Sequence, residues 1–108
     1  QASASREVLD AGALRVDTGS RRAWASGSEI TLSQKEFDLL TCLIRNRGMA
    51  LSRDVLLERV WGYDFLGDSR TVDVHIRWLR EKVEPDPSRP IYIQTVRGVG
   101  YRFEIPPA

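Results

Sequence analysis

The spacing of apolar side chains from Arg70 onward predicts an amphipathic helix. Successive side chains of a helix lie about 100° apart, so one narrow arc collects four aliphatic residues that should face a core: Val72, Ile76, Leu79 and Val83. The opposite arc mixes basic, aromatic and aliphatic residues: Arg70, Thr71, Val74, Arg77, Trp78 and Glu81. A solvated helix face would more often be built from Lys and Glu. The helix is therefore a candidate binding element, with an ordinary surface helix as the alternative.

A tight β-hairpin is predicted after this helix and its Pro-rich connection. Two runs rich in β-branched and aromatic residues, 91–96 and 101–105, flank a turn that contains two glycines able to take positive φ. Arg97 therefore lies at an exposed turn, where it either binds a ligand or merely aids solubility. Alternation in the second run predicts a buried side and a wet side, with Tyr101, Phe103 and Ile105 opposed by Arg102 and Glu104.

Short strands followed by two helices are predicted before residue 62. Apolar stretches separated by glycines between Val8 and Leu32 indicate three or four antiparallel strands, whose sheet Trp24 should cover. Ser33 and Glu36 form a capping box that begins a helix, and Gly48 should end that helix as its C-cap. Ser52 should cap a second helix, which continues to Trp61 and is apolar enough to be buried on most sides.

The loop Gly62–Asp68 then leads to the third helix, which Asp68 or Ser69 should cap. This connection is longer than the three- or four-residue turn usual in a helix-turn-helix. Its apolar residues, Phe65 and Leu66, either serve a partner or fold back on the core.

Composition fits one soluble globular domain and argues against several classes of function. The chain has 108 residues, of which 42% are hydrophobic and 29% charged, and it lacks an apolar run long enough to span a bilayer. The net charge of +1 is weak support for nucleic-acid binding. Cys42 is the single cysteine and His75 the single histidine, so neither a disulfide nor a metal site is expected. We find no nucleophile constellation and no phosphate-binding glycine loop, so neither catalysis nor a cofactor is expected.

The segments RTVDVHIRWLR and TVRGVGYRF closely resemble the DNA-binding domain of OmpR/PhoB-type response regulators, the output half of bacterial two-component systems. The resemblance runs from about Val8 to Ile105. It implies an α+β winged helix-turn-helix with an N-terminal antiparallel sheet, three helices and a C-terminal hairpin wing. On this reading residues 1–7 are a linker or tag remnant, residues 8–106 are the domain, and the receiver domain is not in this chain.

The resemblance also implies roles for individual residues. Position 78 and Val74 would face bases in the major groove, and Arg97 would enter the minor groove. Phosphates would be held by Trp61, Arg70, Thr71, His75, Arg77, Arg80, Thr95 and Tyr101. The loop residues Asp64, Phe65 and Leu66 would contact RNA polymerase. The sequence departs from the family at Trp78, where the best-known members have an arginine that can hydrogen-bond guanine. An indole has one donor and a large apolar surface, so Trp78 would either stack against a sugar or a thymine methyl group, or pack sideways against the loop.

The partners implied are double-stranded DNA with direct-repeat half-sites, a second copy on that DNA, RNA polymerase, and a sensor kinase that acts through the receiver domain. The implied location is the cytoplasm. The alternative is a winged helix that serves protein interaction, with Trp78, Val74 and Phe65 as an adhesive patch.

Overall fold

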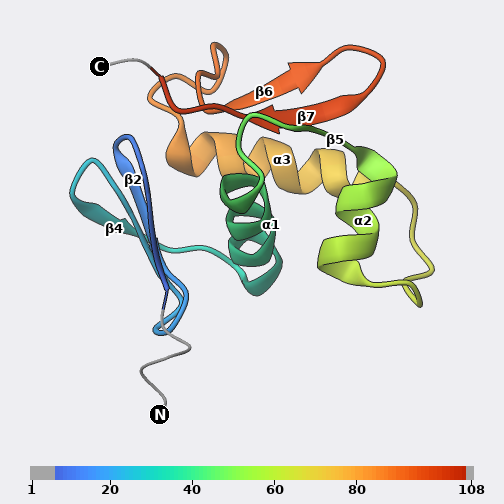
Figure 1. The fold of residues 1–108 in the computed structure, drawn as a ribbon, viewed down its shortest axis with the longest axis horizontal. Helices are drawn as coiled ribbons and strands as arrows, with labels where there is room; N and C mark the ends of the chain where they lie inside the picture. Colours follow the sequence, from blue (N-terminus) through green and yellow to red (C-terminus); the bar gives the residue numbers. More distant parts are fainter. Residues whose placement is uncertain (1–6, 107–108) are drawn as a thin grey trace.

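A computed structural model describes residues 7–106 as two antiparallel sheets and three helices (Figure 1). The first sheet contains β1 (Val8–Ala11), β2 (Leu14–Asp17), β3 (Arg22–Ala25) and β4 (Ser28–Ile30) in sequential order. The helices are α1 (Gln34–Arg45), α2 (Arg53–Trp61) and α3 (Arg70–Val83). The second sheet has the order β5-β7-β6, formed by β5 (Ala50–Ser52), β6 (Ile93–Val96) and β7 (Gly100–Phe103). This is the predicted α+β winged helix.

The predicted linker or tag remnant, residues 1–7, lies almost wholly outside the described residues. Only its last member is described, and the Glu7 carbonyl accepts the Thr18 amide at 2.8 Å. No helix within residues 7–106 is long and apolar enough to cross a membrane.

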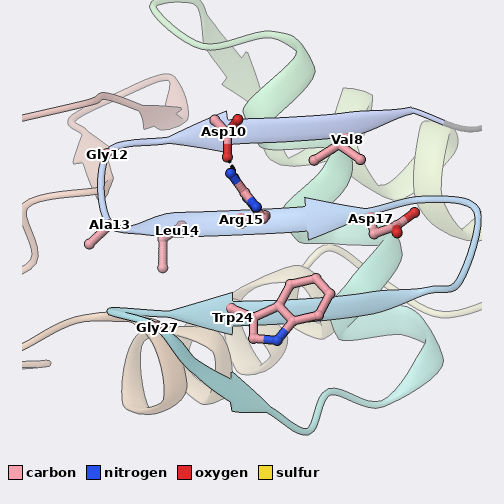
Figure 2. Close-up of a pocket in the computed structure, with 9 residues that line it drawn as sticks. All are labelled: Val8, Asp10, Gly12, Ala13, Leu14, Arg15, Asp17, Trp24 and Gly27. Atoms are coloured by element: carbon pink, nitrogen blue, oxygen red, sulfur yellow. Dashed lines mark hydrogen bonds and ion pairs between the residues drawn. The ribbon is translucent and has the colours of Figure 1, made fainter.

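The N-terminal sheet packs its inner side on α1 and presents a charged outer side. Ala11, Leu14, Val16 and Ala23 are buried. The register aligns Asp10, Arg15 and Trp24 across β1, β2 and β3, which places them together on the outer side, where Asp10 and Arg15 form a 2.7 Å ion pair (Figure 2). Trp24 is half-buried beneath the Arg22 guanidinium, which lies 5.4 Å from its ring centroid.

Helix α1 begins at the predicted capping box but ends earlier than predicted. The Ser33 hydroxyl accepts the Glu36 amide at 3.2 Å, and the Glu36 carboxylate accepts the Ser33 amide at 2.9 Å. The prediction that Gly48 is the C-cap is wrong, because the cap is Asn46, whose side-chain amide donates to the Cys42 carbonyl. Gly48 has a φ of +86°. Its amide instead donates to the Phe103 carbonyl, and the chain continues from it into the second sheet.

Helix α2 begins as predicted but is not buried on most sides. The Ser52 hydroxyl accepts the Val55 amide at 3.1 Å, as expected of the N-cap. Only Leu56 is fully buried in this helix. The prediction that the helix is buried on most sides is wrong, because Asp54, Glu58 and Arg59 are exposed. Four apolar residues are only partly buried where they pack against the core: Val55, Leu57, Val60 and Trp61.

The hairpin wing differs from its predicted limits at both ends. It begins at Ile93 rather than Ile91, because the buried Glu84 carboxylate accepts the amides of Ile91, Tyr92 and Ile93 at 2.8 to 3.2 Å. Tyr101 and Phe103 are buried as predicted, but Ile105 is 38% exposed because it lies beyond the end of β7.

The two glycines of the wing have different roles. Gly98 has a φ of +77° and forms the turn, as predicted. Gly100 is not among the residues with positive φ, and a Cβ built on it would lie 2.1 Å from the Leu51 carbonyl oxygen. Strand β5, which was not predicted from the sequence, approaches β7 closely at this point.

Candidate nucleic-acid interface

Helix α3 presents the predicted two sides. Val72, Ile76, Leu79 and Val83 are buried, while Val74 and Trp78 are 43% and 44% exposed on the opposite side. Arg70 and Arg77 are exposed beside them, and Thr71 is half-buried. At the start of the helix Ser69 occupies the N-cap position without a side-chain hydrogen bond, and the Asp68 carboxylate accepts the Arg70 amide instead.

Three arginines around this side pair with acidic residues. Arg70 lies 2.9 Å from Asp68, Arg77 lies 4.0 Å from Glu81, and Arg53 at the start of α2 lies 3.0 Å from Asp73. The hydrogen bond from Arg70 lowers the pKa of the Asp68 carboxyl, so that side chain stays charged at neutral pH. Exposed ion pairs are weak because water screens them, and a phosphate group can replace the acidic partner.

Tyr101 connects the wing to α3. Its hydroxyl donates to the Asp73 carboxylate at 2.7 Å. Burial, followed by this hydrogen bond, raises the pKa of Tyr101 to about 12, so the phenol stays protonated. The Tyr101 proton, which the sequence interpretation assigned to a phosphate, is therefore held by Asp73 in the free domain.

A groove lies between the wing and the starts of α2 and α3. It encloses about 400 Å³ and is lined by Arg53, Asp73 and residues 95–101. Arg53 was not among the residues predicted from the sequence. Only the tertiary packing brings it beside the wing, since in the sequence it is simply the first residue of a helix.

Arg80 and Thr95 also join α3 to the wing. The Arg80 guanidinium donates to the Ile93 carbonyl at 3.1 and 2.8 Å and to the Thr95 hydroxyl at 2.9 Å. Arg80 also lies 5.6 Å from the centroid of the Tyr101 ring. Both residues were predicted to hold phosphates, and in this structure their hydrogen bonds fix the wing against the helix.

The wing tip presents a free guanidinium. Arg97 is exposed and makes no hydrogen bond or ion pair with any other residue in the range 7–106. The Val99 amide donates to the Val96 carbonyl at 2.9 Å and closes the turn beneath it. The prediction that Arg97 lies at an exposed turn is confirmed.

Four aromatic rings form a row from the loop after α2 to the exposed side of α3. Ring centroids are separated by 6.1 Å from Phe65 to Trp61, by 4.9 Å from Trp61 to His75, and by 4.9 Å from His75 to Trp78. The His75 Nδ1 atom lies 2.9 Å from the Thr71 carbonyl oxygen. Within the described part of the chain the indole N–H of Trp61 has no hydrogen-bond partner, which leaves it available to a ligand.

The loop residues predicted to contact a partner differ in where their side chains lie. Phe65 turns back onto Trp61, whereas Leu66 is 99% exposed and Asp64 is exposed beside it. The exposed segment also includes Tyr63, which the sequence interpretation did not select. Across residues 7–106, no cluster of three His, Cys, Asp or Glu side chains is arranged to hold a metal ion.

The amino-acid sequence is similar to those of known transcriptional regulatory proteins. A protein-family profile described as "Transcriptional regulatory protein, C terminal" matches residues 27–103. The sensory transduction protein RegX3 of Mycolicibacterium smegmatis is 48% identical over 103 residues, which are 95% of this chain and 45% of that protein. The chain thus spans about half the length of the curated relatives it matches.

Solved structures share the fold. The response regulator DrrB of Thermotoga maritima, described as an OmpR/PhoB homolog, superposes with a TM-score of 0.83 at 38% identity, over 90% of this chain and 44% of that one. The RstA DNA-binding domain of Klebsiella pneumoniae, solved in complex with the RstA box, gives a TM-score of 0.82 at 35% identity, over 91% of this chain and 97% of that one.

Proposed function

The chain belongs to the family of C-terminal domains of transcriptional regulatory proteins, as the DNA-binding effector domain of a response regulator, and we propose how it binds double-stranded DNA. Helix α3 enters the major groove with Val74 and Trp78 toward the bases, and the wing brings Arg97 to the adjacent minor groove. No chemical step is involved. The observation that carries this proposal is the position of the Arg97 guanidinium, for which residues 7–106 supply no partner, beside a helix that exposes arginines and apolar side chains together.

Phosphate contacts would position the domain without selecting sequence. On α3 and α2 we assign them to Arg70, Thr71, His75 and Arg77 and to the indole N–H of Trp61, which has no partner within residues 7–106. Near the wing we assign them to Arg80, Thr95 and Tyr101, and we add Arg53, which lines the groove beside the wing. The RstA domain, solved with its DNA box, supports a DNA-bound state for this fold.

The proposal also includes a second copy of the domain, RNA polymerase and a receiver domain. Two copies bind direct-repeat half-sites about one helical turn apart and form a dimer on DNA. The exposed loop with Asp64, Phe65 and Leu66 contacts RNA polymerase, and a receiver domain elsewhere in the full-length protein links the output to a sensor kinase in the cytoplasm. The half-length match to RegX3 leaves room for such a domain in the relatives.

A second candidate function is a protein-interaction module, favoured by the exposed apolar residues Trp78, Val74 and Leu66. Salt separates the two functions, because phosphate contacts release counterions and weaken steeply with salt, whereas an apolar interface does not. Selection of bound sequences from random duplexes tests the first function directly. A repeated motif with salt-dependent affinity supports DNA binding, and failure to enrich any sequence at low salt contradicts it.

Arg97→Ala is expected to weaken DNA binding about three- to tenfold and to reduce the preference for A·T pairs in the flank. A narrow A·T-rich minor groove has a strong negative potential that attracts an inserted arginine. Fluorescence anisotropy at fixed salt, with A·T-rich and G·C-rich flanks, measures both effects. The fold should be unchanged because the tip is exposed. Equal affinity and flank preference in the variant and the parent protein would remove the wing tip from the mechanism.

Arg77→Ala is expected to lower affinity for all sequences alike and to make the slope of log affinity against log salt shallower by about 0.9, the value for one lost phosphate contact. Arg70→Ala should behave in the same way. Arg15→Ala is the matched control, because it removes one positive charge from the outer side of the N-terminal sheet. A changed base preference in either α3 variant would show that the arginine reads a base.

A further inference from the structure

Val74 and Trp78 form a continuous apolar strip on the exposed side of α3. Residues four apart lie one above the other on a helix surface. Their exposed fractions, 43% and 44%, are nearly equal, so both side chains present a face to whatever binds there. Arg70 lies one turn before Val74 in the same row, and Arg77 and Glu81 lie beside Trp78. The middle of the row is thus apolar, with charged residues around it.

The indole of Trp78 is held in position before any ligand binds. Its ring meets the edge of His75 at a centroid distance of 4.9 Å and an interplanar angle of 65°. The imidazole is itself fixed by the edge of Trp61 at 4.9 Å and by its Nδ1 contact with the Thr71 carbonyl. In the range 7–106, the loop after α2 makes its ring contact with Trp61 and not with Trp78. The exposed part of the indole therefore faces outward.

Such a strip is complementary to one kind of chemical group in the major groove. An indole has a single hydrogen-bond donor and no acceptor, and valine has neither. The edges of the base pairs display donors and acceptors, and their apolar feature is the methyl group on C5 of thymine. The same methyl group, in the same place, is carried by 5-methylcytosine.

We infer that Val74 and Trp78 together recognise pyrimidine 5-methyl groups in the major groove, with His75 and Trp61 as positioning residues that orient the indole. The inference rests on the proposed function, since it needs α3 in the groove. It makes Trp78 a specificity-determining residue, in place of the guanine-reading arginine found at this position in the best-known members of the family.

The test removes one thymine methyl group of the duplex at a time. In a duplex obtained by selection, each thymine is exchanged for deoxyuridine, which lacks only the methyl group, and affinity is measured at fixed salt. At one or two positions in each half-site the exchange should weaken binding about fourfold, the worth of one buried methyl group. The remaining thymines are internal controls. The thymine-to-uracil ratio is the affinity for the thymine duplex divided by the affinity for the deoxyuridine duplex. At the sensitive positions, Trp78→Ala or Val74→Ala should reduce this ratio toward one.

A second arm distinguishes the two sources of the methyl group. Placing a cytosine–guanine pair at a sensitive position weakens binding for several reasons, but methylation of that cytosine should recover about fourfold. Recovery shows that the methyl group itself is recognised. A preference for thymine over cytosine that deoxyuridine shares and that methylation of cytosine does not recover would assign the reading to the hydrogen-bonding groups of the A·T pair and overturn the inference.

The positioning role of His75 has its own readout. His75→Phe retains a ring between Trp61 and Trp78, whereas His75→Ala removes it. Both variants lose the imidazole assigned to a phosphate, so the thymine-to-uracil ratio is compared rather than affinity. The ratio should survive in His75→Phe and fall toward one in His75→Ala, and a ratio preserved in both variants would overturn the positioning role.

Trp78→Arg gives a converse result. It should lose the thymine-to-uracil sensitivity and gain a preference for guanine at the same position, since arginine pairs with guanine through two hydrogen bonds. Thermal melts verify that each variant is folded. If the parent protein binds the selected duplex but no deoxyuridine exchange matters, the inference is wrong and the proposed function stands. If the parent protein binds no duplex in a salt-dependent way, both are wrong.

Discussion

Gly100→Ala is expected to lower the free energy of unfolding by about 3 to 5 kcal/mol, among the largest effects of a single substitution. The added methyl group would lie 2.1 Å from the Leu51 carbonyl oxygen and 2.9 Å from the Ser52 Cα atom. Both are backbone atoms, so no side-chain rotation relieves the clash. Strand β5 must separate from β7, and DNA binding should fall with the loss of the wing. Urea unfolding followed by circular dichroism measures the change.

Gly98→Ala is the matched control for this prediction. Gly98 lies in the turn two residues before Gly100 and has a φ of +77°, but within residues 7–106 no heavy atom outside the adjacent residues lies within 4 Å of the position of its missing Cβ. The expected cost is therefore only that of a left-handed backbone conformation, about 1 to 2 kcal/mol. Equal losses in the two variants would mean that the clash at Gly100 is relieved by movement of β5.

Glu84→Ala is expected to destabilise the domain by about 3 to 4 kcal/mol. The buried carboxylate accepts the amides of Ile91, Tyr92 and Ile93, and the amides of Tyr92 and Ile93 lie in buried surroundings. Removal of the carboxylate leaves these donors without a partner, at a cost of about 1 to 3 kcal/mol for each buried group. The loss should appear in urea unfolding and as faster hydrogen exchange at these three amides.

Glu81→Ala provides the comparison for Glu84. Glu81 lies in the last turn of α3, three residues before Glu84, but it is exposed, and its nearest basic group, Arg77, is 4.0 Å away. Its removal should change stability by less than about 0.5 kcal/mol. A comparable loss in the two glutamate variants would show that charge, rather than the three amide hydrogen bonds, accounts for the role of Glu84.

The parts of the fold that depend on local patterns were predictable. The period of the apolar residues from Val72 to Val83 correctly predicted the buried side of α3, and the capping box at Ser33 correctly predicted the start of α1. Both signals arise within a few residues of one another. The exposed turn at Arg97 was predicted for the same reason, because Gly98 favours a tight hairpin.

The features that were missed depend on contacts between distant segments. Strand β5 is three residues long and exists because β7 pairs with it. The start of β6 was predicted two residues early because the amides of Ile91 and Tyr92 bind Glu84, which no local pattern reveals. Helix α2 is less buried than its apolar residues suggest, because Asp54, Glu58 and Arg59 lie among them and stay in water.

The candidate site shows the same division. The exposed residues of α3 could be selected from helical geometry, but the internal hydrogen bonds of Arg80, Thr95 and Tyr101 could not. Arg53 was missed because its neighbour Asp73 is 20 residues away in the sequence. Polar residue types are expected both in a phosphate contact and in a bond that holds the wing, so only the structure reveals the second role of Arg80, Thr95 and Tyr101.

The bonds from Arg80 to the Ile93 carbonyl and the Thr95 hydroxyl fix the separation between α3 and the wing. When this separation is fixed, α3 and the wing tip cannot move independently of each other to fit the two grooves of DNA. In the proposed complex the duplex would instead have to twist or bend until both grooves meet the protein, and the energy of that deformation depends on sequence. Base pairs between α3 and the wing tip should then influence affinity without contacting the protein. Removal of the Arg80 bonds should make the affinity less dependent on the sequence of these base pairs.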